Sequence, residues 1–128
     1  MSYSILIVDD SAIVRRTLRT SFEQNSDWYV CGEAANGREA IDKAQKLRPD
    51  LVVLDLSMPL MGGLEAAREL KRLNPAVPLL MFTTFKTPTI EEEAISAGCE
   101  AVVSKAEVQL LFSSIQRVLR SVPDKKSA

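Results

Sequence analysis

The sequence predicts an α/β fold in which helices cover both faces of a five-stranded parallel sheet. Two runs of strand length, Ile5–Val8 and Leu51–Leu54, are apolar throughout, which is typical of strands that are buried on both faces. Five strand segments alternate along the chain with segments whose apolar residues recur every three or four positions. Strict alternation favours a parallel sheet, because right-handed crossovers place the helices on its faces. A length of 128 residues suits one domain.

The first part of the chain predicts two strands, each followed by a helix. After Ile5–Val8, Ser11 caps a helix whose inner face is formed by Val14, Leu18 and Phe22. Residues 28–33 form a less apolar strand, which we expect nearer an edge of the sheet. The next helix opens at Asn36-Gly37 and closes at Arg48-Pro49. Its inward-facing residues are Ala40, Ile41, Ala44 and Leu47.

The central strand runs into a loop at Asp55, and Pro59 keeps the chain from entering a helix directly. A third helix follows Gly62-Gly63 and ends at Asn74-Pro75. Its inner face is expected to hold Leu64, Ala67, Leu70 and Leu73. Residues 77–82 then form a fourth buried strand, which ends in Thr83-Thr84.

The last part of the chain predicts a helix, a strand and a final helix. Thr87 caps the first of these helices, an early Pro88 and the acids at 91–93 favour its start, and Gly98 ends it. Ile90, Ala94 and Ile95 are expected to face inward. After a strand at 101–103, the final helix has its core face at Val108, Leu111, Phe112, Ile115 and Leu119, with Leu110 off that face. Residues 1–121 therefore form the domain, and 122–128 are expected to be a tail or the start of a linker.

Composition excludes several classes of function. The net charge of −1 gives no general attraction to nucleic acid or to anionic membranes, and no apolar run approaches the length of a membrane span. The chain has no histidine, which excludes Ser-His-Asp and Cys-His catalysis and histidine metal sites. Cys31 and Cys99 stand apart without a metal-binding motif, so we expect free, mostly buried thiols in a reducing cytoplasm.

Charged and polar residues follow four of the five predicted strands. Asp9 and Asp10 follow the first strand, Asp55 the third, Thr83 the fourth and Lys105 the fifth. The carboxyl ends of parallel strands meet at one edge of the sheet, which is where such sheets bind ligands. Clustered carboxylates repel by about 4 kcal/mol per pair at an effective dielectric constant near 20, so they need a compensating cation. Oxygen-only ligands favour a hard ion such as Mg²⁺. The second strand ends with Glu33, to which the sequence assigns no role.

The same residues resemble the receiver domain of bacterial two-component response regulators. The resemblance rests on Asp9-Asp10, on Asp55 followed by Met58-Pro59 and Gly62-Gly63, and on Thr83 and Lys105, and it covers essentially the whole chain. It implies a flavodoxin-like (βα)5 fold, with the five parallel strands in the order 2-1-3-4-5.

The resemblance implies a role for each residue at this edge. Asp55 is the expected phosphoryl acceptor, a carboxylate nucleophile that forms an aspartyl phosphate. Asp10 and Asp55 are expected to bind Mg²⁺ directly, the backbone carbonyl of Ser57 to be a third ligand, and Asp9 to act through water. Lys105 would pair with the phosphoryl oxygens, and the Thr83 hydroxyl would donate a hydrogen bond to them. Charge neutralisation by a metal and a lysine is what attack on an anionic phosphate needs.

The resemblance also implies partners and an output surface. The phosphoryl donor is a sensor histidine kinase or a phosphotransfer protein, and the domain is a regulator rather than an enzyme. The charge of the phosphoryl group would attract Thr83 and Lys105. Their movement would change the surface formed by the fourth helix, the fifth strand and the fifth helix. A second copy of the domain or an output domain would bind this surface. Direct binding to nucleic acid or to a membrane is not expected.

Three positions depart from the family's pattern. Val102 stands where many receivers have an aromatic residue that tracks activation, and Ala106 stands where the family often has proline. Phe85 has two interpretations, a substitute for that aromatic residue or a packed loop side chain. Together with Ser57, it occupies a position that influences in the family how fast the phosphoryl group is lost.

The sequence also bears on three other functions. A nucleotide-binding or flavin-binding domain lacks support, because there is no GxGxxG or GxxxxGK[ST] motif and the first strand ends in two acids. A phosphatase with an aspartate nucleophile would have a DxD arrangement on the first strand, whereas here Asp9 and Asp10 are adjacent. The remaining alternative is a receiver-like interaction module that is not phosphorylated.

Overall fold

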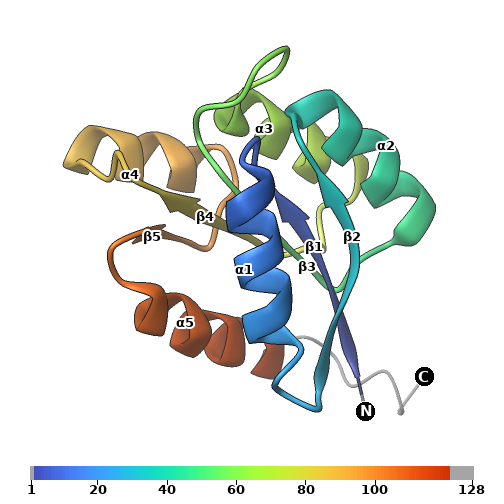
Figure 1. Cartoon of the computed structure of the whole chain (residues 1–128). Helices are drawn as coiled ribbons and strands as arrows, with labels where there is room; N and C mark the ends of the chain where they lie inside the picture. Colours follow the sequence, from blue (N-terminus) through green and yellow to red (C-terminus); the bar gives the residue numbers. More distant parts are fainter. Residues whose placement is uncertain (1, 122–128) are drawn as a thin grey trace.

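The computed structural model describes residues 2–121, in which five strands and five helices alternate (Figure 1). The elements are β1 (Tyr3–Val8), α1 (Ala12–Phe22), β2 (Trp28–Ala34), α2 (Gly37–Leu47), β3 (Leu51–Leu54), α3 (Gly63–Leu73), β4 (Leu79–Thr83), α4 (Pro88–Ser96), β5 (Ala101–Ser104) and α5 (Val108–Arg120). The sheet is parallel, with the order β2-β1-β3-β4-β5. The predicted fold is therefore confirmed. The predicted tail at 122–128 lies outside the described residues.

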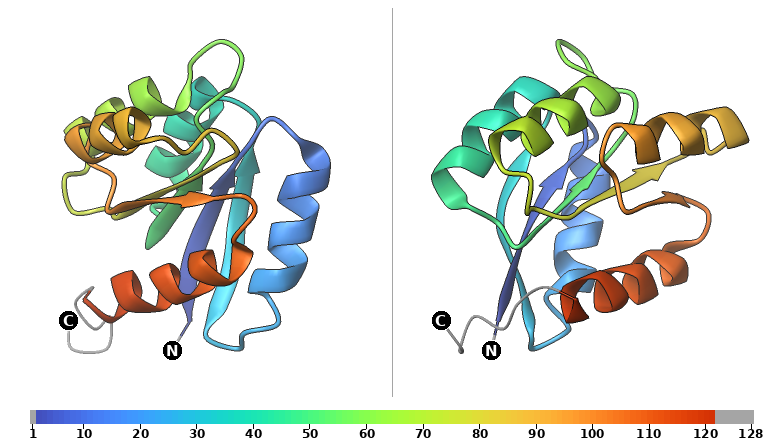
Figure 2. Two further views of the ribbon diagram at one scale, coloured as in Figure 1. Left: turned by 90° about the vertical axis from the view of Figure 1, so that its left-hand side faces the viewer. Right: turned by 180° about the vertical axis from the view of Figure 1, so that it is seen from behind.

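The sheet separates two hydrophobic cores. Ile5 and Ile7 of β1 face the core shared with α1 and α5, while Leu6 and Val8 face the core shared with α2, α3 and α4. Figure 2 shows α1 and α5 on one side of the sheet and the other three helices on the opposite side. Because successive side chains of a strand point to opposite faces, a strand between two helical layers must be apolar at every position. This accounts for the continuous apolar runs of β1 and β3.

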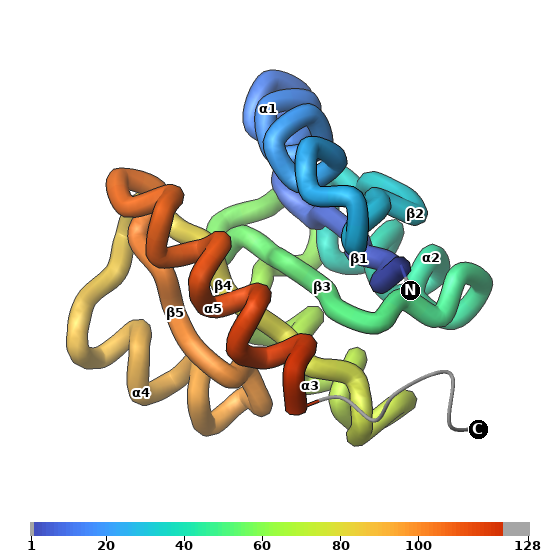
Figure 3. Tube along the Cα trace, turned by 90° about the horizontal axis from the view of Figure 1, so that it is seen from below, coloured from blue at the N-terminus to red at the C-terminus, as the bar shows by residue number. Residues whose placement is uncertain are grey.

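The less apolar strand lies at an edge of the sheet, as predicted. Figure 3, which views the sheet from below, shows β2 and β5 at opposite sides. Tyr29 on β2 is exposed, whereas every residue of the central strand β3 is buried. Among the described residues, no helix is long and apolar enough to cross a membrane.

The polar residues predicted to start helices do so. Ser11 accepts a hydrogen bond from the Val14 amide, Asn36 from the Glu39 amide and Thr87 from the Ile90 amide. These side chains bond amides of the first turn that have no partner within the helix. Each cap fixes where the chain leaves the carboxyl edge of the sheet and turns back along it.

Four predicted core residues are substantially exposed. Leu47 is 42% exposed, Leu73 39%, Ile95 48% and Val108 38%. Leu47 and Leu73 are the last residues of α2 and α3, and Val108 is the first residue of α5, so each has a neighbouring helical turn on one side only. Ile95 is turned by about 100° around α4 from Ala94, which is fully buried, and α4 buries only a narrow stripe. The prediction that Leu110 lies off the core face is confirmed, because it is 47% exposed.

Candidate functional site at the carboxyl edge of the sheet

Three carboxylates meet where β1 and β3 end. Asp9, Asp10 and Asp55 each offer an oxygen atom, and these atoms lie within 4.8 Å of one another. Asp9 and Asp55 are buried, while Asp10 is exposed. The backbone fixes the first two: the Asp9 amide donates to the Ala34 carbonyl at 3.0 Å, and the Asp55 amide donates to the Val8 carbonyl at 2.9 Å. The predicted convergence of the three acids therefore exists.

Lys105 binds two of these acids. Its Nζ lies 2.7 Å from Asp9 Oδ2 and 3.2 Å from Asp55 Oδ2. Burial and the charge of Asp9 raise the pKa of Asp55, and Lys105 opposes them. Partial burial lowers the pKa of Lys105, but its contacts with Asp9 and Asp55 outweigh this and raise the pKa overall. One ammonium thus compensates a cluster of three acids, which leaves the site short of positive charge.

Thr83 lies fully buried in the last position of β4, between β3 and β5, the strands that Asp55 and Lys105 directly follow. Its hydroxyl accepts a hydrogen bond from the Phe85 amide at 3.1 Å, and its carbonyl accepts one from the Lys105 amide at 2.9 Å. It makes no hydrogen bond to Asp55. The structure therefore places Thr83 at the predicted edge, with its backbone tied to that of Lys105.

The loop after β3 holds Asp55 by close backbone packing. The Leu56 amide donates to Asp55 Oδ1 at 2.7 Å, and the Gly63 amide donates to the Leu56 carbonyl at 2.8 Å. A Cβ atom at Gly63 would lie only 2.1 Å from the Asp55 carbonyl oxygen, so no larger residue fits there. Ser57, the predicted carbonyl ligand, is exposed in this loop. The sequence suggested Gly63 as the start of a helix and as part of the receiver motif, and the structure shows that it also sets how tightly the loop packs on Asp55.

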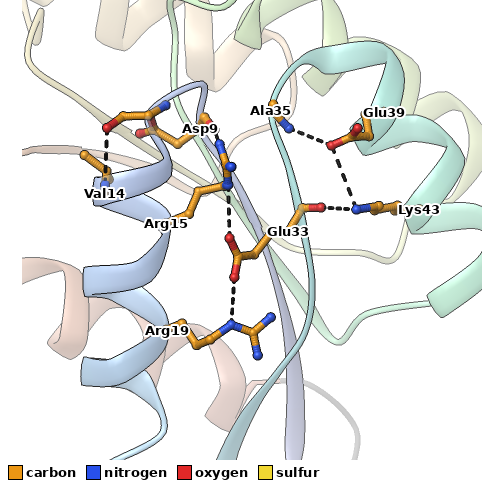
Figure 4. A network of polar contacts seen from close by, with 9 residues as sticks. Asp9, Val14, Arg15, Arg19, Glu33, Ala35, Glu39 and Lys43 are labelled. Atoms are coloured by element: carbon orange, nitrogen blue, oxygen red, sulfur yellow. Dashed lines mark hydrogen bonds and ion pairs between the residues drawn. The ribbon is translucent and has the colours of Figure 1, made fainter.

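A network at the end of β2 was missed by the sequence analysis. Glu33 binds two arginines of α1: Oε1 accepts from Arg15 Nε at 3.0 Å, and Oε2 accepts from Arg19 Nε at 2.7 Å (Figure 4). Arg15 also donates from Nη1 to the Asp9 carbonyl at 2.7 Å. Burial acts to raise the pKa of Glu33, but the two arginines hold it below its usual value. The four-residue spacing of Arg15 and Arg19 was the available signal, since such residues share a helix face.

The donor set fits a hard divalent cation. The three clustered groups are all carboxylates, and among the described residues no thiol lies with them. Mg²⁺ prefers oxygen ligands. The three carboxylates carry more negative charge than the one lysine neutralises, which favours a divalent cation. An anionic group could approach the same edge only with this added positive charge. The arrangement therefore suits a metal together with a phosphoryl group.

Comparison with known proteins agrees with this geometry. Residues 5–116 match the family described as "Response regulator receiver domain". The chain belongs to this family. It is a regulatory module of two-component systems, for which phosphorylation and Mg²⁺ binding at an acidic pocket are typical.

Similar proteins include enzymes much longer than this chain. A protein-glutamate methylesterase/protein-glutamine glutaminase of Alkalilimnicola ehrlichii is 41% identical over 124 residues, which is 94% of this chain and 32% of that protein. A similarly named protein of Paramagnetospirillum magneticum is 47% identical over 105 residues, 82% of this chain and 29% of that protein. This chain thus spans about a third of the length of these relatives.

Solved structures show the same fold. The response regulator domain of Thermotoga maritima CheB has a TM-score of 0.87 at 26% identity and covers 96% of this chain and 100% of that one. A two-component response regulator of the LuxR family from Aurantimonas sp. SI85-9A1 has a TM-score of 0.90 at 31% identity, covering 99% of this chain and 94% of that one.

The positions that depart from the family pattern are now placed. Val102 is buried in the core under α2, α3 and α4, so no aromatic ring stands at this position of β5. Phe85 is 59% exposed, and its interpretation as a packed loop side chain is wrong. Ala106 precedes α5, whose cap residue Glu107 makes no side-chain capping bond. Cys31 and Cys99 are both free, as predicted.

Proposed function

We propose that this receiver domain is a phosphorylation-activated switch that accepts a phosphoryl group on Asp55 in a Mg²⁺-dependent reaction. The observation that carries the proposal is the cluster of three carboxylates with oxygens within 4.8 Å, closed on one side by the ion pairs of Lys105. The charge balance of this cluster favours a bound cation and an anionic partner together. The donor is a sensor histidine kinase or a phosphotransfer protein, because the chain itself has no histidine.

Asp10 and Asp55 are the proposed direct ligands of Mg²⁺, together with the backbone carbonyl of Ser57, and Asp9 acts through water. When bound, the metal supplies positive charge that offsets the repulsion between the Asp55 carboxylate and the incoming phosphoryl group. Asp10 is exposed and makes no hydrogen bond or ion pair to any described residue, so its carboxylate is free to bind a ligand.

In the proposed transfer, an oxygen of Asp55 attacks phosphorus and forms the new P–O bond, while the bond from phosphorus to the donor's imidazole nitrogen breaks and its electron pair leaves with the donor. Asp55 must be ionised to attack. Lys105, which already bonds Asp55 at 3.2 Å, follows the charge onto the phosphoryl oxygens. The Thr83 hydroxyl donates to the same oxygens once it turns away from the Phe85 amide.

The movements of the Lys105 and Thr83 side chains transmit the phosphorylation of Asp55 to the surface of the domain. The Lys105 amide bonds the Thr83 carbonyl, so displacement of either side chain pulls on the loops after β4 and β5. The surface formed by α4, β5 and α5 adjoins both loops, and we propose it as the output and homodimer surface. A beryllofluoride adduct of Asp55 is expected to shift the amide resonances of residues 84–106. Unmoved resonances there, with shifts confined to the acid cluster, would contradict this output surface.

The phosphoryl transfer itself is tested by intact-mass spectrometry after incubation with Mg²⁺ and acetyl phosphate. We expect one phosphoryl increment, lost with chelator and in Asp55→Asn. No increment with acetyl phosphate or with other small phosphodonors would reject the switch and favour a receiver-like interaction module. The same proposal places the domain in the cytoplasm, without direct binding to nucleic acid.

A further inference from the structure

The end of β2 contacts the acid cluster through one side chain. Arg15 bridges two groups: its Nε donates to Glu33 Oε1 at 3.0 Å, and its Nη1 donates to the Asp9 carbonyl at 2.7 Å (Figure 4). The other oxygen of Glu33 accepts from Arg19, so both carboxylate oxygens are occupied and Glu33 holds a fixed position on β2. The Arg15 side chain is only 18% exposed, so it has little room to adopt conformations that do not make this bridge.

The carbonyl that Arg15 binds belongs to the peptide unit that joins Asp9 to Asp10. Because a peptide unit is planar, a hydrogen bond to its oxygen restrains the direction in which the chain leaves toward Asp10. On the other side, the Asp9 amide donates to the Ala34 carbonyl of β2, and Asp9 Oδ1 accepts from the Ser11 amide. The backbone of Asp9 is thus fixed at both ends. The Asp10 side chain itself makes no hydrogen bond or ion pair to any described residue that would orient it.

We propose that Arg15, clamped by Glu33, is a positioning residue that orients Asp10 for binding of a divalent cation. This inference rests on the metal site of the proposed function and assigns a role to two residues outside the cluster. Arg15 acts through the Asp9–Asp10 peptide and does not touch the metal. Groups that orient ligands from outside commonly change metal affinity by about 10- to 100-fold when they are altered.

The net charge of Arg15 has the opposite effect to its geometry. A positive charge near a cation site repels Mg²⁺, so removing the charge alone would strengthen binding. Arg15→Lys keeps the charge but has a single ammonium group in place of the planar fork that reaches Glu33 and Asp9 at once. This substitution therefore isolates the bridge. Arg16→Lys is the matched control, because Arg16 is exposed on the same helix and makes no hydrogen bond or ion pair to a described residue.

The experiment measures Mg²⁺ affinity by isothermal titration calorimetry, and unfolding by urea in the presence of chelator. We expect Arg15→Lys to weaken Mg²⁺ binding about tenfold and Arg16→Lys to leave it unchanged. In the metal-free protein, the carbonyl ¹³C resonance of Asp9 is expected to shift in Arg15→Lys only. The cost of Glu33→Gln to Mg²⁺ affinity should be smaller in the Arg15→Lys background than in the native chain, because both residues act as one unit.

The outcomes separate the two proposals. If the native chain fails to bind Mg²⁺, the proposed function fails. If the native chain binds Mg²⁺ and Arg15→Lys binds it equally well, only the positioning role is overturned. A lower free energy of unfolding with unchanged Mg²⁺ affinity would also overturn it, because Arg15 would then serve only to join α1 to β2.

Discussion

Asp55→Asn should stabilise the metal-free protein. The substitution removes one of three clustered negative charges and keeps the shape of the side chain. Asn Oδ1 can still accept the hydrogen bond from the Leu56 amide, and Lys105 keeps its ion pair with Asp9. The fold is therefore preserved while the charge balance of the site changes.

The size of the effect follows from the distances. At an effective dielectric constant of about 20, Asp9 and Asp55 at no more than 4.8 Å repel by at least about 3.5 kcal/mol. The attraction between Asp55 and Lys105 at 3.2 Å is about 5 kcal/mol on the same basis. The Asp55 carboxylate also repels the exposed, screened Asp10, and this repulsion offsets most of the net attraction left by the other two pairs. The pairwise charge interactions of Asp55 therefore nearly cancel, and the cost of burying its charge decides whether the substitution stabilises the protein. We expect Asp55→Asn to gain about 1–2 kcal/mol near neutral pH.

The gain should depend on pH in a defined direction. Because the folded-state pKa of Asp55 is raised, its ionisation costs stability at every pH above the unfolded-state pKa. As pH falls through the folded-state pKa, the native chain recovers this cost, and the difference from Asp55→Asn disappears below about pH 3.9. With Mg²⁺ at a hundredfold excess over Kd, binding adds about 2.7 kcal/mol to the native chain and reverses the order.

Urea unfolding with chelator, with Mg²⁺ and across this pH range measures all three effects. Asp42→Asn is the control: Asp42 lies exposed on α2, outside the cluster, and its substitution should change stability by less than about 0.5 kcal/mol. If Asp55→Asn were no more stable than the native chain with chelator near neutral pH, the charge balance argued for this site would be incorrect.

Three further predictions follow from single contacts. Gly63→Ala should destabilise the domain by about 3 kcal/mol in urea unfolding, because its Cβ would lie 2.1 Å from the Asp55 carbonyl oxygen. Gly62→Ala, whose Cβ would lie 3.3 Å from its nearest atom, should lower the free energy of unfolding clearly less. Equal losses in the two variants would show that the loop does not pack closely on Gly63. Lys105→Met should strengthen Mg²⁺ binding at least about tenfold in calorimetry while abolishing phosphorylation by acetyl phosphate, and weaker binding would show that Lys105 does not compete with the cation. Iodoacetamide should label Cys31 before Cys99 in the native protein, because burial raises the pKa of Cys99 to about 12; equal labelling would contradict the buried environment of Cys99.

The sequence predicted the fold because its signals are local and agree with one another. Continuous apolar runs identified the buried strands, and Ser11 and Thr87 marked helix starts that the structure confirms. The meeting of Asp9, Asp10 and Asp55 was also predictable, because parallel strands end at one edge. Their catalytic and ligand roles stay predictions.

Features that depend on tertiary packing could not be predicted. Leu47 is exposed at the end of α2 and Ile95 lies beside the narrow stripe that α4 buries, and periodicity alone does not give how wide a helix face the neighbouring elements cover. The contact between Gly63 and the Asp55 carbonyl needs the path of the loop. Glu33 and Arg15 lie on different elements, and their pairing across α1 and β2 appears only once the elements are placed.

Asp55 is the proposed phosphoryl acceptor among three neighbouring acids. Borohydride reduces an aspartyl phosphate to homoserine, which peptide mapping locates to a single residue. After treatment with Mg²⁺ and acetyl phosphate, we expect homoserine at position 55 and none at 9 or 10. Homoserine at position 9 or 10 with an unmodified Asp55 would show that Asp55 is not the acceptor.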